Sequence, residues 1–149
     1  MKINEVIKSN RFTNEKHKAS LNMLYTAYWL KDQLITSLKP HGITLEQHNV
    51  LRILKGSHPN EMRVKDIASR MVEKSSNVPR IIDKLVIKNL AQRTISEIDK
   101  RETYVALTTK GISVIGKARK TMDKVTEDLL RIDESDAKIL NDILEKMRG

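Results

Sequence analysis

The sequence predicts a mainly α-helical fold with one small β-hairpin. Apolar residues recur at three- and four-residue spacing through most of the chain, which is the pattern of helices that bury one face. One Thr- and Ile-rich stretch near residue 100 alternates as strands do. A chain of 149 residues can bury one hydrophobic core, so we expect a single domain over residues 1–149.

Composition narrows the classes of function. The chain carries 28 Lys and Arg against 19 Asp and Glu, a net charge of +9, which favours a polyanionic partner such as nucleic acid. There is no cysteine, which excludes disulfides and thiolate metal sites. We find neither a signal peptide nor an apolar run of membrane-spanning length, and we therefore expect a cytoplasmic protein.

The first half of the chain predicts helices after a polar, basic segment that reads as a short helix or a frayed arm. The expected helices cover residues 20–38, 44–56 and 64–71. Pro40 and Gly42 end the first helix. Thr44 and Gln47 form a capping box at the start of the second, because each side chain can bond a free backbone N–H group.

The stretch from residue 75 to residue 88 predicts a helix with two different faces. Its apolar positions fall at i, i+3, i+4 and i+7: Val78, Ile81, Ile82 and Leu85. We expect Ser75 and Ser76 to cap it and Pro79 to be tolerated in its first turn. Small polar and basic residues on the other face suit a helix that enters the major groove of DNA, although an ordinary surface helix shows the same pattern.

Residues 91–98 and 102–107 then read as a β-hairpin with the charged turn Asp99-Lys100-Arg101 at its tip. A long helix should follow over 109–131, capped by Thr108, and a last helix should begin after the capping signal at 133–136. Basic and acidic residues balance over 112–149, so the positive surplus lies upstream. These last helices carry more apolar surface than so small a lobe needs. Packing on their own chain is the alternative to a dimer interface.

In this order of elements the sequence resembles the MarR family of bacterial transcriptional regulators. The residues that carry the resemblance are Ile67-Ala68, Ser76-Asn77-Val78-Pro79-Arg80, Asp83-Lys84-Leu85, Asn89-Leu90, Arg93, Asp99-Lys100-Arg101 and Leu107-Thr108-Thr109-Lys110-Gly111. Asn89 stands where the family usually has glycine, and Pro79 where it more often has Ser or Thr. The resemblance implies a winged helix-turn-helix lobe over about 44–111, with dimerisation helices over about 20–38 and 112–149.

A sequence-specific DNA-binding regulator follows from this resemblance: a ligand-responsive repressor that binds a palindromic operator as a homodimer. The expected DNA contacts are Arg63, Lys65, Ser75, Ser76, Asn77, Arg80, Lys84, Lys100 and Arg101. Asp99 should hold the wing arginine, because phosphate repels a carboxylate. The alternative is a winged-helix module that binds protein and not DNA. Such modules usually lack a basic wing tip and a basic recognition face.

Tyr25, Tyr28 and Trp29 cluster in the first long helix. Core or dimer packing is the favoured interpretation of this cluster, and the alternative is that it lines a pocket for a small organic effector. His41 and His48 are not part of a tight cluster of ligands, so we expect no metal site and no cofactor. The sequence also lacks a phosphate-binding loop, a nucleophile elbow and a zinc-protease motif, and it therefore predicts no enzyme.

Overall fold

A computed structural model describes residues 1–149. Helices and strands follow one another along the chain as α1 (Ile3–Val6), α2 (Glu15–Leu38), the 3-10 helix η1 (Lys39–His41), α3 (Leu45–Ser57), β1 (Met62–Arg63), α4 (Val64–Ser69), α5 (Val78–Ile87), β2 (Ala91–Ile95), β3 (Thr103–Leu107), α6 (Thr109–Leu129) and α7 (Glu134–Arg148). The fold is mainly helical with a small antiparallel sheet, as predicted. None of the helices is long and apolar enough to cross a membrane.

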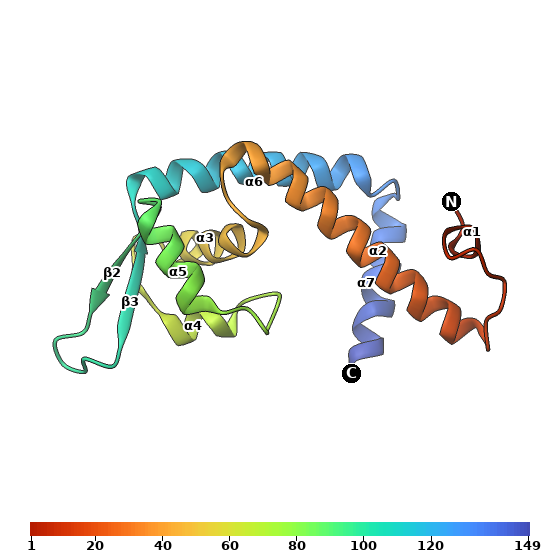
Figure 1. Cartoon of the computed structure of the whole chain (residues 1–149), viewed down its shortest axis with the longest axis horizontal. Helices are drawn as coiled ribbons and strands as arrows, with labels where there is room; N and C mark the ends of the chain where they lie inside the picture. The colour runs from red at the N-terminus through yellow and green to blue at the C-terminus, as the bar shows by residue number, and fades with distance from the viewer.

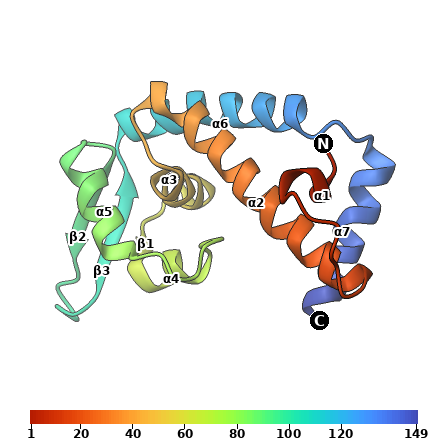
Figure 2. The same ribbon diagram turned by 45° about the vertical axis from the view of Figure 1, so that its right-hand side comes forward.

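The elements form a lobe and an elongated extension. Helices α3, α4 and α5 and the sheet gather at one end of the molecule, and the β2–β3 hairpin projects from it (Figure 1). Helix α6 leaves this lobe and runs toward the opposite end, where α7 turns away from it and α1 lies (Figures 1 and 2). Helix α2 packs against α6 along this extension. The architecture is a winged helix-turn-helix with long flanking helices.

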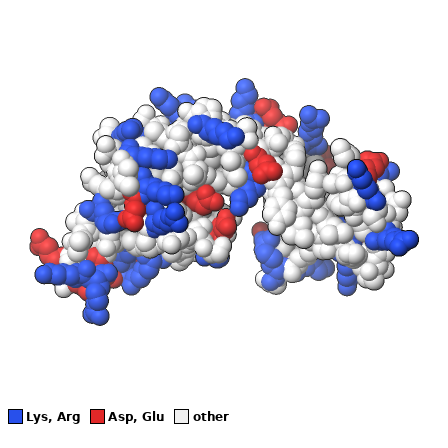
Figure 3. Space-filling view, viewed as in Figure 1, with Lys and Arg blue, Asp and Glu red and all other residues white.

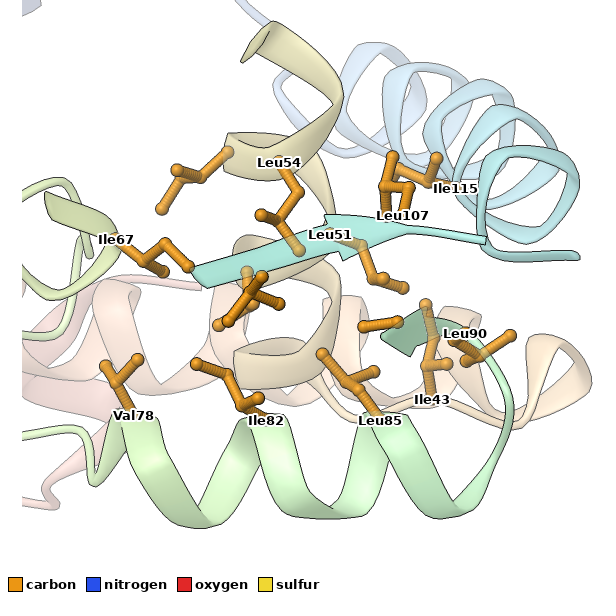
Figure 4. Packing of buried hydrophobic residues seen from close by; sticks show 14 of the residues in the cluster. Ile43, Leu51, Leu54, Ile67, Val78, Ile82, Leu85, Leu90, Leu107 and Ile115 are labelled. Carbon is orange, nitrogen blue, oxygen red and sulfur yellow. The ribbon is translucent and has the colours of Figure 1, made fainter. Parts of the chain in front are cut away.

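The core lies between helix α5 and its neighbours. Val78, Ile82 and Leu85 point from α5 toward Leu51 of α3 and Ile67 of α4, and all five side chains are buried (Figure 4). These are the positions that the helical periodicity predicted. Burial of such side chains stabilises the fold by about 1.5–3 kcal/mol each. The opposite face of α5 is thereby left in solvent.

The sheet contains three strands in the order β1-β3-β2, one more than the predicted hairpin. In the added strand β1, Met62 pairs with Val105 and Arg63 pairs with Tyr104. A two-residue strand is too short to show alternation, so the sequence pattern did not reveal it. This pairing places Arg63 beside the base of the hairpin.

Several helix ends differ from the predictions. Helix α2 begins at Glu15, earlier than residue 20, because Asn14 caps it by accepting a hydrogen bond from the His17 N–H at 2.9 Å. Helix α5 begins at Val78, so the prediction that Ser75 and Ser76 open it is wrong. Asn77 takes the capping position instead, and its Oδ1 accepts from the Arg80 N–H at 3.2 Å.

Other local predictions are confirmed. Thr44 and Gln47 form the capping box of α3, and Thr108 caps α6. Pro79 lies in the first turn of α5, where a missing N–H is not needed. Asn89 ends α5 with a φ of +58°, the left-handed conformation that Asn tolerates better than most residues with a side chain.

Candidate nucleic-acid interface

The solvent face of α5 presents two cations that have no partner in the chain. Arg80 and Lys84 are exposed, lie four residues apart on one side of the helix and form no ion pair. Asp83, between them in sequence, forms an ion pair with Arg93 of β2. That pair connects α5 to the hairpin and leaves Arg80 and Lys84 free to meet an external anion.

The three residues before α5 lie in different environments. Ser75 and Asn77 are exposed, but the Oδ1 of Asn77 is already used by the cap, so its amide group is what remains for a ligand. The Oγ of Ser76 is buried and forms no hydrogen bond in the chain. Ser76 lines a cleft on the α2 side of the lobe, so it does not share the open face of Arg80.

The tip of the hairpin is shaped by short polar contacts. The Oγ of Ser96 accepts from the N–H groups of Ile98 and Asp99, both at 3.2 Å. The Oδ1 of Asp99 accepts from the Arg101 N–H at 3.0 Å and lies 3.4 Å from Arg101 Nε. Arg101 is nevertheless 92% exposed, and Lys100 is exposed with no ion pair. The tip thus offers two cations to solvent.

A groove of about 580 Å³ lies between α5 and the β2–β3 hairpin, which is the wing of this fold. Its charged lining residues are Arg63, Lys65, Asp83, Arg93, Arg101 and Glu102. Figure 3 shows Lys and Arg side chains gathered over this end of the molecule, with acidic side chains among them. Arg63 and Lys65, predicted as phosphate contacts, therefore share a groove with Arg101.

Acidic residues hold the cations of this groove. Arg63 Nε donates to Asp66 Oδ2 at 2.8 Å, and this hydrogen bond lowers the pKa of Asp66 and raises the pKa of Arg63. Arg63 Nη1 and Lys65 Nζ each lie 3.5 Å from Glu102 Oε1. These pairs are too exposed to add much stability, but they set where the cations sit.

Sequence reasoning missed two residues of this groove. Arg93 entered it only as part of the family resemblance, with no role, and Glu102 was counted as an ordinary strand residue. The charge of Arg93 was the sequence signal for a surface position, and the structure places it exposed on β2. No sequence signal could have paired Glu102 with Arg63, because the two residues are 39 positions apart and meet only through the β1–β3 pairing.

A second cleft of about 430 Å³ lies between α2, α3 and the turn before α5. Its apolar side includes Leu30, Leu34 and Met122, and its polar side includes His48 and Ser76. His48 Nε2, like Ser76 Oγ, is buried without a hydrogen-bond partner. Burial, followed by the nearby charge of Arg52, lowers the pKa of His48, so the imidazole is neutral near pH 7.

The aromatic residues predicted for an effector pocket do not line this cleft. Tyr25 and Tyr28 are 44% and 66% exposed, and neither they nor Trp29 are among its lining residues. Helix α2 presents Ala27, Leu30, Lys31 and Leu34 to the cleft instead. The aromatic cluster belongs to a different part of the α2 surface.

Helix α7 has no buried residue, although its sequence is amphipathic. Its exposed apolar side chains are Ile139, Leu140, Ile143 and Met147. Leu24, Tyr25 and Tyr28 of α2 are exposed as well. An amphipathic helix that buries no residue on its own chain has an apolar face without a partner.

Comparison with known proteins agrees with this geometry. The MarR family profile matches residues 43–103, which run from the start of the helical lobe to the wing. The chain is 35% identical over 82 residues to the HTH-type transcriptional repressor MdtR and 27% identical over 86 residues to the HTH-type transcriptional regulator MhqR, both from Bacillus subtilis. These alignments cover 55% and 58% of this chain, and 52% and 58% of the relatives, so the chain matches little more than half of their length.

Solved structures extend the likeness to the whole fold. The Staphylococcus aureus MepR–DNA complex superposes with a TM-score of 0.78 at 23% identity, covering 92% of this chain and 97% of MepR. A MarR family regulator from Streptomyces coelicolor, also in complex with DNA, superposes with a TM-score of 0.80 at 17% identity, covering 94% and 90% of the two chains. At such identities these structures establish the fold. The profile match adds that residues 43–103 are similar to the MarR family of transcriptional regulators.

Proposed function

We propose that this protein is a homodimeric, sequence-specific DNA-binding repressor of transcription. The observation that carries the proposal is the pair of unpartnered cations on the open face of α5, Arg80 and Lys84, in the same lobe as the exposed cations of the wing tip. A module that binds only protein does not require exposed cations on both this helix and the wing tip. Such a repressor acts in the compartment that holds the chromosome, the cytoplasm of a bacterium.

Each element has a role in this proposal. The first turns of α5 enter the major groove, where Arg80 contacts a guanine edge and Ser75 and Asn77 approach the bases. Lys84 meets the phosphate backbone, and so do Arg63 and Lys65 from the start of α4. The wing places Arg101 and Lys100 at the minor groove, with Asp99 orienting the arginine. Ser76 is left out, because its hydroxyl is buried.

The experiment for DNA binding begins with a library of random duplexes. The full chain is used to select bound sequences, and the affinity for the best selected duplex is compared with that for a scrambled one. We expect an inverted repeat whose half-sites lie about one helical turn apart, since a two-fold dimer presents two copies of α5. Equal affinity for selected and scrambled duplex across salt concentrations would leave only general electrostatic binding and refute sequence-specific regulation.

The dimer in this proposal uses the extension of the molecule. Helix α7, with the apolar side chains of α2 and the end of α6, provides the interface that a second copy would cover. Sedimentation at micromolar concentration should give twice the 17.1 kDa chain mass. Leu140→Asp and Ile143→Asp together should reduce that mass to one chain, because buried carboxylates oppose association. A folded parent monomer at that concentration would refute the dimer.

The proposed regulation by a small molecule uses the cleft beside α2. The cleft beside α2 suits a small organic ligand with an apolar body and one polar group, because its apolar walls end at the free Nε2 of His48 and Oγ of Ser76. Ser76 directly precedes the cap of α5, so a ligand there can change how the recognition helix is presented. This is the position that we now prefer to the Tyr25–Trp29 cluster.

A panel of phenolic ligands tests the cleft. Thermal unfolding should identify binders, and a binder should weaken association with the selected duplex. Ala27→Trp fills the cleft from α2 and should abolish the response, whereas Thr26→Trp, an exposed neighbour that does not line the cleft, should retain it. An undiminished response in Ala27→Trp would place the ligand elsewhere.

A further inference from the structure

Glu102 is an unexpected residue for a surface that binds DNA. It lies at the base of the wing, inside the groove that also holds Arg63, Lys65 and Arg101. Its Oε1 is 3.5 Å from both Arg63 Nη1 and Lys65 Nζ, and its Oε2 accepts a hydrogen bond from the Tyr104 hydroxyl at 3.1 Å. Both oxygens of the carboxylate are therefore occupied.

These contacts hold the carboxylate in a fixed place between two cations. The hydrogen bond to Glu102 raises the pKa of the Tyr104 hydroxyl, which stays protonated and keeps donating at neutral pH. Arg63 is also held from its other side by Asp66 at 2.8 Å. The side chain of Glu102 is 31% exposed, so solvent and an approaching anion can reach it.

A carboxylate at this point opposes the approach of phosphate in two ways. It repels the phosphate directly, and it occupies the cations that would otherwise bind it. Counterion release on DNA binding counts only the phosphates that a protein neutralises. Arg63 and Lys65 therefore contribute little while they remain paired with Glu102, unlike the unpaired Arg80, Lys84 and Lys100.

We propose that Glu102 is a specificity-determining residue that keeps Arg63 and Lys65 from binding phosphate except on a cognate site. This inference rests on the proposed DNA-binding function. Exposed ion pairs are weak, so phosphate held close to the groove displaces Glu102, whereas a backbone farther away does not. Base contacts by Arg80 draw α5 into the major groove and bring the backbone close. Random sequence makes no such contacts, and the two cations stay paired.

The test compares Glu102→Gln with the parent chain. Glutamine keeps the shape of the side chain and an oxygen for Tyr104 but removes the charge. Glu97→Gln is the matched control, because Glu97 is an exposed acid in the same hairpin that forms no ion pair. Affinity is measured between 50 and 200 mM salt on a scrambled duplex and on the best duplex selected by the parent chain.

Glu102→Gln should steepen the salt dependence on scrambled duplex only. If each protomer of a dimer frees one cation, the slope of log affinity against log salt concentration becomes steeper by about 1.8. The affinity of Glu102→Gln for scrambled duplex then falls about tenfold more between 50 and 200 mM salt than that of the parent chain. The slope on the selected duplex should stay unchanged, since the pairs are already broken there. Adding Lys65→Gln and Arg63→Gln to Glu102→Gln should return the slope on scrambled duplex to the parent value.

Three results would overturn this inference. Identical behaviour of Glu102→Gln and Glu97→Gln on both duplexes would mean that Glu102 contributes only background charge. Weaker binding to both duplexes with a lower melting temperature would make Glu102 a structural support of the wing. A parent chain that selects no duplex at all would remove the proposed function itself, and this result is distinguishable because it precedes any comparison of variants.

Discussion

Replacing Arg80 by alanine is the sharpest test of the proposed DNA-reading face of α5. The Arg80 side chain is exposed and forms no ion pair. The donor of its hydrogen bond to Asn77 Oδ1 is the backbone N–H of Arg80, not its guanidinium. Alanine keeps that bond and has the highest helix propensity, so the fold should be unaffected. A bidentate arginine–guanine contact is worth about 1–3 kcal/mol, and a homodimer makes it twice. At about 1.4 kcal/mol per factor of ten, the selected duplex should bind about 30-fold to 20,000-fold more weakly.

Fluorescence anisotropy on selected and scrambled duplexes at one salt concentration measures this loss. Lys120→Ala removes the same charge from the exposed surface of α6 and serves as the control, with circular dichroism as the check of folding. Scrambled duplex should lose far less affinity than the selected one, because it makes no base contact. If Arg80→Ala behaves like Lys120→Ala on the selected duplex, the recognition face has been assigned to the wrong residues. If Arg80→Ala unfolds, Arg80 has a structural role that its exposure does not reveal.

Three further predictions concern the wing, the core and pH. Arg101→Ala should weaken binding to selected and scrambled duplex alike. In a salt titration, the slope of log affinity against log salt concentration should fall in magnitude by about 0.9 per protomer. An unchanged slope would place Arg101 away from phosphate. Gly111→Ala should destabilise the fold by about 1–3 kcal/mol or more in urea unfolding, because the new Cβ would lie 2.0 Å from the Leu90 carbonyl oxygen. The control is Gly116→Ala, whose Cβ meets nothing within 4 Å and should leave stability unchanged. Burial lowers the pKa of His48 in the folded chain from its ordinary value of 6.5, so the unfolded state binds more protons and the free energy of unfolding should fall as pH drops below 6.5. His48→Leu should lose this part of the acid-dependent loss of stability. The same loss of stability in His48→Leu would contradict the prediction.

In the wing, the local sequence predicted the two strands of the hairpin but not the side-chain pairs at its base. The alternation of residues 91–107 and the charged turn at 99–101 predicted the β2–β3 hairpin, which the structure contains. The register that brings Arg63 to Tyr104 could not be predicted, because it depends on a two-residue strand from a distant segment. The network around Glu102 follows from that register and from nothing nearby in sequence.

The turn before α5 also shows which features the sequence predicted and which depended on tertiary packing. Helical periodicity identified the buried face of α5, since residues three and four apart share one side of a helix whatever the rest of the chain does. Ser76 was assigned to the DNA face because it is small and polar, which is true of residues on either side of such a turn. In the structure this hydroxyl is buried, and Ser76 lines the cleft that is also lined by residues of α2 and α3.

The sequence by itself determined the long helices, the caps of α3 and α6, the hairpin, the buried face of α5 and the identity of its exposed cations. All of these depend on residues within about four positions of one another or on strict alternation. Only the tertiary structure decided which cations are paired, where the cleft lies and which aromatic residues stay outside it. Those properties depend on side chains from segments far apart in the chain, and their distances are set by how the helices and strands pack.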